Sequence, residues 1–262
     1  LPYRRHVLGP ASVIETLAAQ QMRDFHRHWY QPQSITAVAV GNLPVDELIR
    51  VVENSFNQMT GDRPPSALPP LCPPSLSPES PFQTITRRDV TDPSLQQARL
   101  VMTWRVPGLN NLEQTYALDV LASVLGHGRT SRFVQDLREQ RGLVTSISAS
   151  NMTYQQQGAF YISAHLPEEN LERVEAEILQ HIRTVQNELI SAWEIDRVRT
   201  RVANHFVFGN ETPGDRSGLY GYYYALLRDL APALNYPALI HSLDAEQLRT
   251  AAQQFLSPDA YG

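Results

Sequence analysis

Apolar spacing and β-branched runs predict a helix–strand–helix order for the first sixty residues. Apolar positions three or four apart predict helices over 16–30 and 45–57. Between them, the β-branched stretch 34–41 favours a strand buried on both faces. The apolar positions that define the first helix are Met22, Phe25 and Trp29. This part of the chain is therefore expected to combine helices with a buried strand.

Beyond residue 82, further strands and helices are expected. Strands are predicted over 83–90 and 97–106, and the second alternates apolar with polar side chains as a half-buried antiparallel strand does. Residues 143–150 and 158–166 predict two more strands that form a hairpin. Apolar stripes predict helices over 112–125, 130–140, 171–189, 192–208, 215–229, 234–242 and 245–256. The longest stripe consists of Leu171, Val174, Ile178, Ile182, Val185 and Leu189.

A proline-rich segment separates these two parts. Residues 61–82 intersperse prolines with serines, a composition that favours extended polyproline geometry and acts as a semi-rigid spacer. The stretch FHRHWYQPQSI, which follows the first predicted helix, resembles AAQQFLSPDAY at the last one. Such an echo is a sign of two related domains. We therefore place a domain boundary in residues 61–82.

Composition narrows the class of protein. The chain has 262 residues, 42% of them hydrophobic, and a net charge of −5, which argues against a general nucleic-acid surface. No apolar run is long enough to span a bilayer, so we expect a soluble protein of the bacterial cytoplasm or periplasm. All 22 basic residues are arginine, and the lack of lysine excludes a Walker-type phosphate loop and a lysine Schiff base. With Cys72 as its single cysteine, the chain has no internal disulfide or thiolate metal cluster.

The stretch LGHGRTSRFVQDLREQRGL, residues 125–143, allows two interpretations. In the first it is a phosphate site, formed by Arg129, Arg132 and the amide groups at the start of the following helix. It follows a predicted helix rather than a strand, however, and it lacks the third glycine of a dinucleotide fingerprint.

The second interpretation is a structural turn. Gly126 would end the preceding helix in a left-handed conformation, Gly128 would let the chain turn, and Thr130 or Ser131 would cap the next helix. We favour the turn over the phosphate site.

Metal binding is not supported by the histidines. No two of the eight histidines are four residues apart, the spacing that places two imidazoles on one helix face. Residues 165–169, HLPEE, imitate part of a zinc motif, but Pro167 interrupts it and the second histidine is missing. Separately, the tyrosine-rich stretch 220–229 predicts core or interface packing.

Four stretches resemble one family of enzymes. LGHGRTSRFVQDLREQRGLVTSISAS is similar, nearly end to end, to the pattern LGGGxSSRLFQELREKRGLAYSV. PYRRHVLGP is similar to HPYxRPVxG, with Leu1 in place of the histidine, and EIDRVRTRVANHF is similar to ELERAKxxL. MRDFHRHWYQPQSITAVAVGNLPVDELIRVVENSF resembles a closing helix–strand–helix unit. These patterns belong to the pitrilysin/insulinase family of zinc peptidases, particularly its processing-peptidase branch.

The resemblance implies an α+β fold of the processing-peptidase-like metallohydrolase type, with a mixed, mostly antiparallel sheet covered by helices. Two such domains enclose a chamber, so residues 1–60 would be the remnant of the first, zinc-bearing domain and residues 83–262 the second domain, which has no metal site. The family holds zinc with an H-x-x-E-H helix and a distant glutamate. Neither occurs in this chain, so zinc is expected only in the full-length protein.

The resemblance also implies substrate-binding residues. The family's second domain contacts substrate through an arginine and a tyrosine seven residues later; here Arg138 and Thr145 occupy those positions. Arg132 and Gly128, in the same segment, complete the candidate set. An arginine can hold a peptide carbonyl by a charge-assisted hydrogen bond, whereas a threonine hydroxyl is shorter than a phenol. Alternatively, Arg138 forms only a surface ion pair with Glu139 or a neighbouring acid.

The predicted function is that of a fragment of a zinc-dependent metalloendopeptidase that cleaves extended peptides. This chain would supply the non-catalytic half that grips the substrate and would be inactive alone. The alternative is a non-catalytic partner or assembly subunit of a processing-peptidase-like complex. Expected partners are a peptide or unfolded polypeptide and either a second copy or a related subunit; no nucleic acid and no membrane span are expected.

Overall fold

The structure is a computed structural model that describes residues 8–31, 34–60 and 77–262. The chain divides into two compact units. The first unit comprises residues 1–77 and 208–233, and the second comprises residues 78–207 and 234–262. Cys72 and most of the predicted linker at 61–82 lie outside the described residues.

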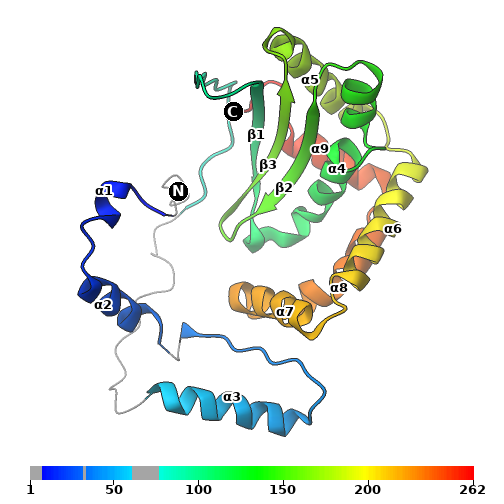
Figure 1. The fold of residues 1–262 in the computed structure, drawn as a ribbon. Helices are drawn as coiled ribbons and strands as arrows, with labels where there is room; N and C mark the ends of the chain where they lie inside the picture. The colour runs from blue at the N-terminus through cyan, green and yellow to red at the C-terminus, as the bar shows by residue number, and fades with distance from the viewer. Residues whose placement is uncertain (1–7, 32–33, 61–76) are drawn as a thin grey trace. The chain divides into compact units, whose positions relative to one another are not determined.

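A three-stranded antiparallel sheet forms the centre of the second unit (Figure 1). Its strands are β1 (Ala98–Pro107), β2 (Ser146–Thr153) and β3 (Gln157–Leu166), in the order β1-β3-β2. The β2–β3 pair confirms the predicted hairpin, and β1 confirms the predicted half-buried strand. Met102, Trp104 and Val106 of β1 are buried, because alternate side chains of a strand point to the same face.

Helices cover one face of this sheet. The helix α4 contacts β2 and β3, whereas α5 and α9 contact β1 (Figure 1). The second unit also includes short helices and parts of α6 and α8, which cross the boundary between the units. The bounds are η3 Leu109–Gln114, α4 Tyr116–Gly126, η4 Val134–Gln140, η5 Glu168–Asn170, α5 Leu171–Asn187, α6 Ala192–Phe208, α8 Ala231–Ser242 and α9 Ala245–Phe255.

The helix α4 lies in the core of the second unit. Every residue from Tyr116 to Gly126 is buried except Asp119, whose carboxylate accepts hydrogen bonds from Asn151 Nδ2 at 2.8 Å and Tyr236 Oη at 3.1 Å. The stripe of α5 is also buried from Val174 to Val185. The helix ends at Asn187, however, so Leu189 lies beyond it and is 49% exposed. The prediction that Leu189 belongs to the buried stripe is wrong.

The predicted strand at 83–90 is also wrong. This segment has no strand pairing, although the amide of Thr86 donates to the carbonyl of Tyr261. Gly262 in turn exchanges both backbone hydrogen bonds with Thr103 of β1. The backbone of this segment therefore has only Tyr261 and Gly262 beside it, a stretch too short to form a β-ladder. A side-chain cluster holds the segment instead, because Glu175 accepts hydrogen bonds from Arg87 and from Tyr261 at 2.6 Å each.

The first unit consists of helices and extended segments. Its helices are α1 (Ala11–Ile14), α2 (Ala19–Trp29), α3 (Val45–Thr60) and α7 (Pro213–Leu227). Residues 35–40 form no strand, so the strand predicted at 34–41 is wrong; the described part of this unit offers it no partner strand. The extended segment instead approaches α7 and the residue after it, where Arg228 donates to the hydroxyl of Thr36 at 3.3 Å.

The tyrosine-rich stretch falls in α7, which buries none of its residues. Tyr222 and Tyr224 are 51% and 42% exposed, so core packing of this stretch is not observed among the described residues. None of the helices in the described part of the chain is long and apolar enough to cross a bilayer.

Candidate functional site

The glycines that follow α4 have different roles. Gly128 has a φ of +81° with open space around it, which confirms that it turns the chain. Gly126 is the last residue of α4 and lacks a positive φ, so its predicted left-handed conformation is wrong. A side chain at Gly126 would lie 2.1 Å from the backbone nitrogen of Ala149 in β2. Glycine is therefore required there by the close packing of α4 against the sheet.

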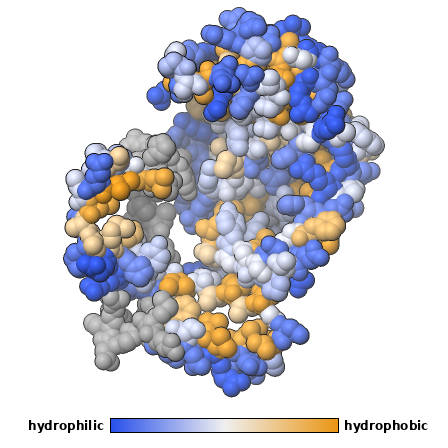
Figure 2. All heavy atoms as spheres, viewed as in Figure 1, coloured by the Kyte–Doolittle hydropathy of each residue, from blue (hydrophilic) through white to orange (hydrophobic). Residues whose placement is uncertain are grey.

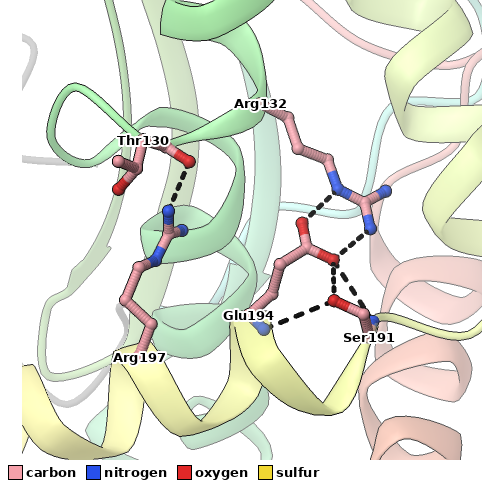
Figure 3. Close-up of polar contacts among 5 residues, drawn as sticks. All are labelled: Thr130, Arg132, Ser191, Glu194 and Arg197. Carbon is pink, nitrogen blue, oxygen red and sulfur yellow. Dashed lines mark hydrogen bonds and ion pairs between the residues drawn. The ribbon is translucent and has the colours of Figure 1, made fainter.

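The helix after this turn is irregular. Residues 134–140 form a π-helix, η4, which follows a short α-helical start at Arg132. The predicted cap is wrong, because the hydroxyl of Ser131 donates to the carbonyl of Gly128 and, among the described residues, no amide of the next turn donates to the hydroxyl of Thr130 or Ser131. The carbonyl of Thr130 accepts a hydrogen bond from Arg197 of α6 (Figure 3). Such π-helical turns occur frequently at functional sites.

Arg132 is fixed by a carboxylate on α6. Its guanidinium donates to both oxygens of Glu194, at 2.7 and 2.9 Å (Figure 3). The hydroxyl and amide of Ser191 also donate to Glu194. Burial by itself would raise the pKa of Glu194, but the hydrogen bonds from Arg132 and Ser191 outweigh it and lower the pKa to about 2. Arg132 is thus committed to an internal ion pair.

Arg138 has a different environment on the same helix. It donates to Glu139 at 3.1 and 2.5 Å, and both side chains are 34% exposed. The hydrogen bond from Arg138 lowers the pKa of Glu139. This is the ion pair that the alternative for Arg138 predicts. An exposed pair of adjacent residues is held weakly, and a bound carbonyl could replace it.

Thr145 lies immediately before β2. Its amide donates to the carbonyl of His165, and its hydroxyl is 2.9 Å from Gln97 Oε1 and 3.0 Å from that same carbonyl. The hydroxyl thus helps to join β2 to β3. Among the described residues, no hydrogen bond joins any two of Gly128, Arg132, Arg138 and Thr145, so the four share one segment without forming one cluster.

A group of ionisable side chains fixes η4 to α5. Asp136 lies 2.8 Å from His181 Nε2 and 3.5 Å from Arg141, and Arg141 also lies 2.5 Å from Glu177. The hydrogen bond that Arg141 donates to Glu177 is the largest of the interactions that raise the pKa of this arginine. These pairs hold the helix that carries Arg138 in place.

Clusters of potential metal ligands are missing from the described part of the chain. No group of three or more histidine, cysteine, aspartate or glutamate side chains there could hold a metal ion. The residues that the structure describes therefore do not fit a zinc site.

Two features of this region were missed at the sequence level. Ser191 and Glu194 form a capping box at the start of α6, and the spacing S-x-x-E before an apolar run is its known signal. Asp119 is the other: its side chain is partly buried, and the loss of hydration at its carboxyl raises its pKa to about 6. The one sequence signal for this feature is a single acidic residue within an otherwise apolar helix.

Comparisons with known proteins cover nearly the whole chain. Residues 16–202 match the model of a family described as the peptidase M16 inactive domain. An uncharacterized zinc protease of Rickettsia bellii is 25% identical over 260 residues, which are 99% of this chain and 60% of that protein. A crystal structure of a protease from Helicobacter pylori is 20% identical, with a TM-score of 0.85, and the match covers 97% of this chain and 59% of that one.

A further structural match comes from a large assembly. A chain in the structure of complex III from Candida albicans is 15% identical, with a TM-score of 0.74 over 98% of this chain and 60% of that one. The structural matches show the fold and confirm the α+β class. This chain spans about 60% of the length of the proteins named here.

Proposed function

The chain belongs to the peptidase M16 family, of which it carries the inactive domain, and on this premise we propose that it forms the substrate-gripping half of a zinc-dependent endopeptidase. The resemblance predicted from the sequence is that of the same family, and relatives of the chain are named zinc proteases. Because the described residues do not fit a zinc site, the metal belongs to another part of the full-length protein in this proposal. The chain alone is then inactive.

The proposal assigns different origins to the parts of the chain. Residues 1–60 are the end of the first, zinc-bearing domain, residues 61–82 are the linker, and residues 83–262 are the second domain. The length of the relatives supports this assignment, since the chain matches about 60% of them.

The observation that carries the proposal is the contrast between two arginines of one helix. Arg132 is 20% exposed and binds both oxygens of Glu194, whereas Arg138 is 34% exposed and binds only the side chain of its neighbour, Glu139. Exchanging an exposed ion pair for a hydrogen bond to a peptide carbonyl costs little, because surface pairs contribute about 0–1 kcal/mol. Arg138 is therefore the arginine of this helix that is available to a substrate.

The position of β2 supports an extended substrate. This strand pairs with β3 alone, and the described residues place no strand on its other side. An extended peptide can add to such an edge through its main chain, which selects conformation rather than sequence. Thr145 is the residue before β2, and Arg138 lies seven residues before Thr145. A peptide at this edge would therefore lie beside the segment that carries both residues.

The test is peptide cleavage by the complete protein. Quenched fluorescent peptides of extended conformation should be cleaved, and a chelator should abolish cleavage. Arg138→Ala should lower kcat/KM about tenfold or more, since a charge-assisted hydrogen bond is lost, while the melting temperature stays unchanged. The matched control is Arg173→Ala, which removes an exposed arginine from α5. Cleavage that resists the chelator, or equal turnover by both variants, would contradict the proposal.

A second candidate function is that of a non-catalytic assembly subunit. Thr145 favours it, because its hydroxyl is engaged with Gln97 and His165 and no phenol is available at that position. The likeness to a chain of the Candida albicans complex III structure is in keeping with it. The complete protein would then bind no zinc in elemental analysis and would co-purify with a second, different chain in constant ratio.

A further inference from the structure

One face of α6 carries a regular row of cationic and aromatic side chains. Trp193, Arg197, Arg201 and His205 are each four residues apart, so they lie along one side of the helix. With Asp196, Thr200 and Asn204 of the adjacent row, they line an open hollow of about 710 Å³. All of these residues belong to the second unit.

The two arginines of this row have no carboxylate partner among the described residues. Arg197 donates to the carbonyl of Thr130 (Figure 3), and Arg201 makes only a long contact of 3.4 Å with the hydroxyl of Ser123. Burial lowers the pKa of Arg197; the charge of Glu194 counteracts this in part, and the charge of Arg201 lowers the pKa further. The charge of Arg201 also acts on His127, whose pKa is lowered first by burial and then by this arginine. The two guanidiniums therefore bring positive charge close together, and the charge of Glu194 offsets it only in part.

Nearby acids offset this positive charge only in part. Glu194 acts on Arg197 through its charge, while its oxygens accept hydrogen bonds from Arg132 and Ser191. Asp196 lines the hollow and pairs with Arg199 at 2.9 Å. Among the described residues, neither Glu194 nor Asp196 forms an ion pair with Arg197 or Arg201.

Trp193 adds an apolar surface to the row. Its indole is 64% exposed, and the guanidinium of Arg197 lies 5.2 Å from the ring centroid, over one face. The opposite side of the ring can receive an apolar or aromatic side chain. A cationic pair beside an exposed indole matches a ligand that is anionic at one end and apolar at the other.

We propose that this hollow on α6 binds a polypeptide segment in which a side-chain carboxylate contacts Arg197 and Arg201 while a neighbouring apolar side chain packs on Trp193. A guanidinium matches the planar, two-oxygen geometry of a carboxylate. Phosphate sites, in contrast, commonly use free backbone amides at the start of a helix. The hollow extends along the middle of α6, Ala192–Phe208, where the amides already donate to the preceding turn.

No residue that lines the hollow belongs to β2, and binding there does not depend on zinc or cleavage. Binding is therefore measured directly on the 262-residue chain. The probe is a fluorescein-labelled, terminally blocked hexapeptide that contains Phe-Asp at its centre, compared with a twin that contains Phe-Asn. The Asp peptide should bind about tenfold more tightly, because each charge-assisted hydrogen bond is stronger than its neutral counterpart, and added salt should reduce this difference.

Three variants test the assignment of residues. Arg201→Gln should remove most of the preference for the Asp peptide, while Arg183→Gln, which neutralises an exposed arginine on α5, should leave it intact. Trp193→Ala should weaken both peptides to the same extent, about threefold. Circular dichroism of each variant verifies that it is folded, and the two independent variants keep the test valid if one is not.

Three outcomes would overturn the assignment. The first is equal binding of the Asp and Asn peptides by the unmodified chain. The second is equal loss of preference in Arg201→Gln and Arg183→Gln, which would mean that overall charge rather than the hollow attracts the peptide. The third is displacement of the peptide by inorganic phosphate at far lower concentration than by acetate, which would assign the hollow to a phosphorylated ligand instead.

Discussion

The two compact units contain helices with similar amphipathic patterns, but only the second unit buries them. In α5 of the second unit, Ile178 and Ile182 are fully buried. In α2 of the first unit, Phe25 and Trp29 hold corresponding positions in a helical stripe, yet they are 56% and 42% exposed. The two helices share a sequence pattern but differ in how much of their apolar face is covered.

The difference extends over the whole of the first unit. Its described residues include only two buried side chains, Gln31 and Ala233, and neither is a large apolar residue. Figure 2 shows hydrophobic residues at the surface over α1 and α3. A single fully buried large apolar side chain stabilises a fold by about 1.5–3 kcal/mol. The first unit gains little of this stabilisation from the residues described, so amphipathic periodicity identifies a helix face without supplying what covers it.

The largest test of this comparison is truncation of one aromatic ring in each unit. Phe160→Ala in β3 should lower the free energy of unfolding by about 4 kcal/mol, because it leaves a cavity beside Trp104 in the core. Phe25→Ala in α2 should change it by only about 0.5 kcal/mol, since that ring is largely exposed. Denaturant unfolding followed by circular dichroism measures both.

A large loss for Phe25→Ala would break the comparison. It would mean that α2 buries this ring against a surface that is not among the described residues. Leu118→Ala in α4, which is fully buried, serves as a second core variant and should resemble Phe160→Ala.

The contrast also explains how much of the fold was predictable. Helices with long apolar stripes were predicted correctly in both units, because helical periodicity is encoded within one segment. The strands at 34–41 and 83–90 were predicted from composition but are not formed. The backbone N–H and C=O groups of a strand must pair with a neighbouring strand. The sequence of the segment itself does not show whether such a neighbour is present. Leu189 was misplaced for the opposite reason, because the helix ended two residues earlier.

Predictions about the site also succeeded where they depended on local sequence and failed where they depended on distant residues. The turn at Gly128 followed from local glycine chemistry and is confirmed. The role of Gly126 was wrong because it depends on the approach of Ala149, a residue of a distant strand. That Arg132 would bind Glu194 could not be predicted either, since sixty-two positions separate them. The functional roles of Arg138 and Thr145 stay predictions.

Glycine substitutions sharpen the comparison at the level of backbone packing. Gly126→Ala should destabilise the second unit by about 3 kcal/mol, because the new methyl group would meet the backbone of Ala149. Gly41→Ala in the first unit should be close to neutral, since its nearest neighbour would be the flexible end of Leu48 at 3.8 Å. Thermal unfolding of the two variants gives the comparison directly. Equal effects would indicate that α4 can shift away from the sheet at little cost.

Asp119 tests whether water reaches a partly buried carboxyl group in the core of the second unit. Its pKa in the folded chain, about 6, lies above its ordinary value of 3.8, so its stabilising contribution is complete below pH 4 and is lost as the pH rises through 6. Asp119→Asn should therefore gain about 2 kcal/mol relative to the unmodified chain between pH 4 and pH 8. Unfolding by urea at the two pH values measures this gain. An unchanged difference would mean that water reaches the carboxylate.

The smallest expected effect concerns the ion pair between Arg132 and Glu194, which distinguishes Arg132 from Arg138. Glu194→Gln should destabilise the chain by about 1.5 kcal/mol at pH 7, because the guanidinium of Arg132 loses its charged acceptor, whereas Glu53→Gln on exposed α3 should stay within about 0.5 kcal/mol. The pKa of Glu194 is lowered to about 2, so its contribution is present above pH 4.5 and is lost as the pH falls through 2. Urea unfolding at pH 7 and pH 2 should show the two variants diverging at the higher pH and converging at the lower one. If Glu194→Gln instead matches Glu53→Gln at both, Arg132 is no more firmly held than Arg138, and the reason for assigning substrate contact to Arg138 alone is lost.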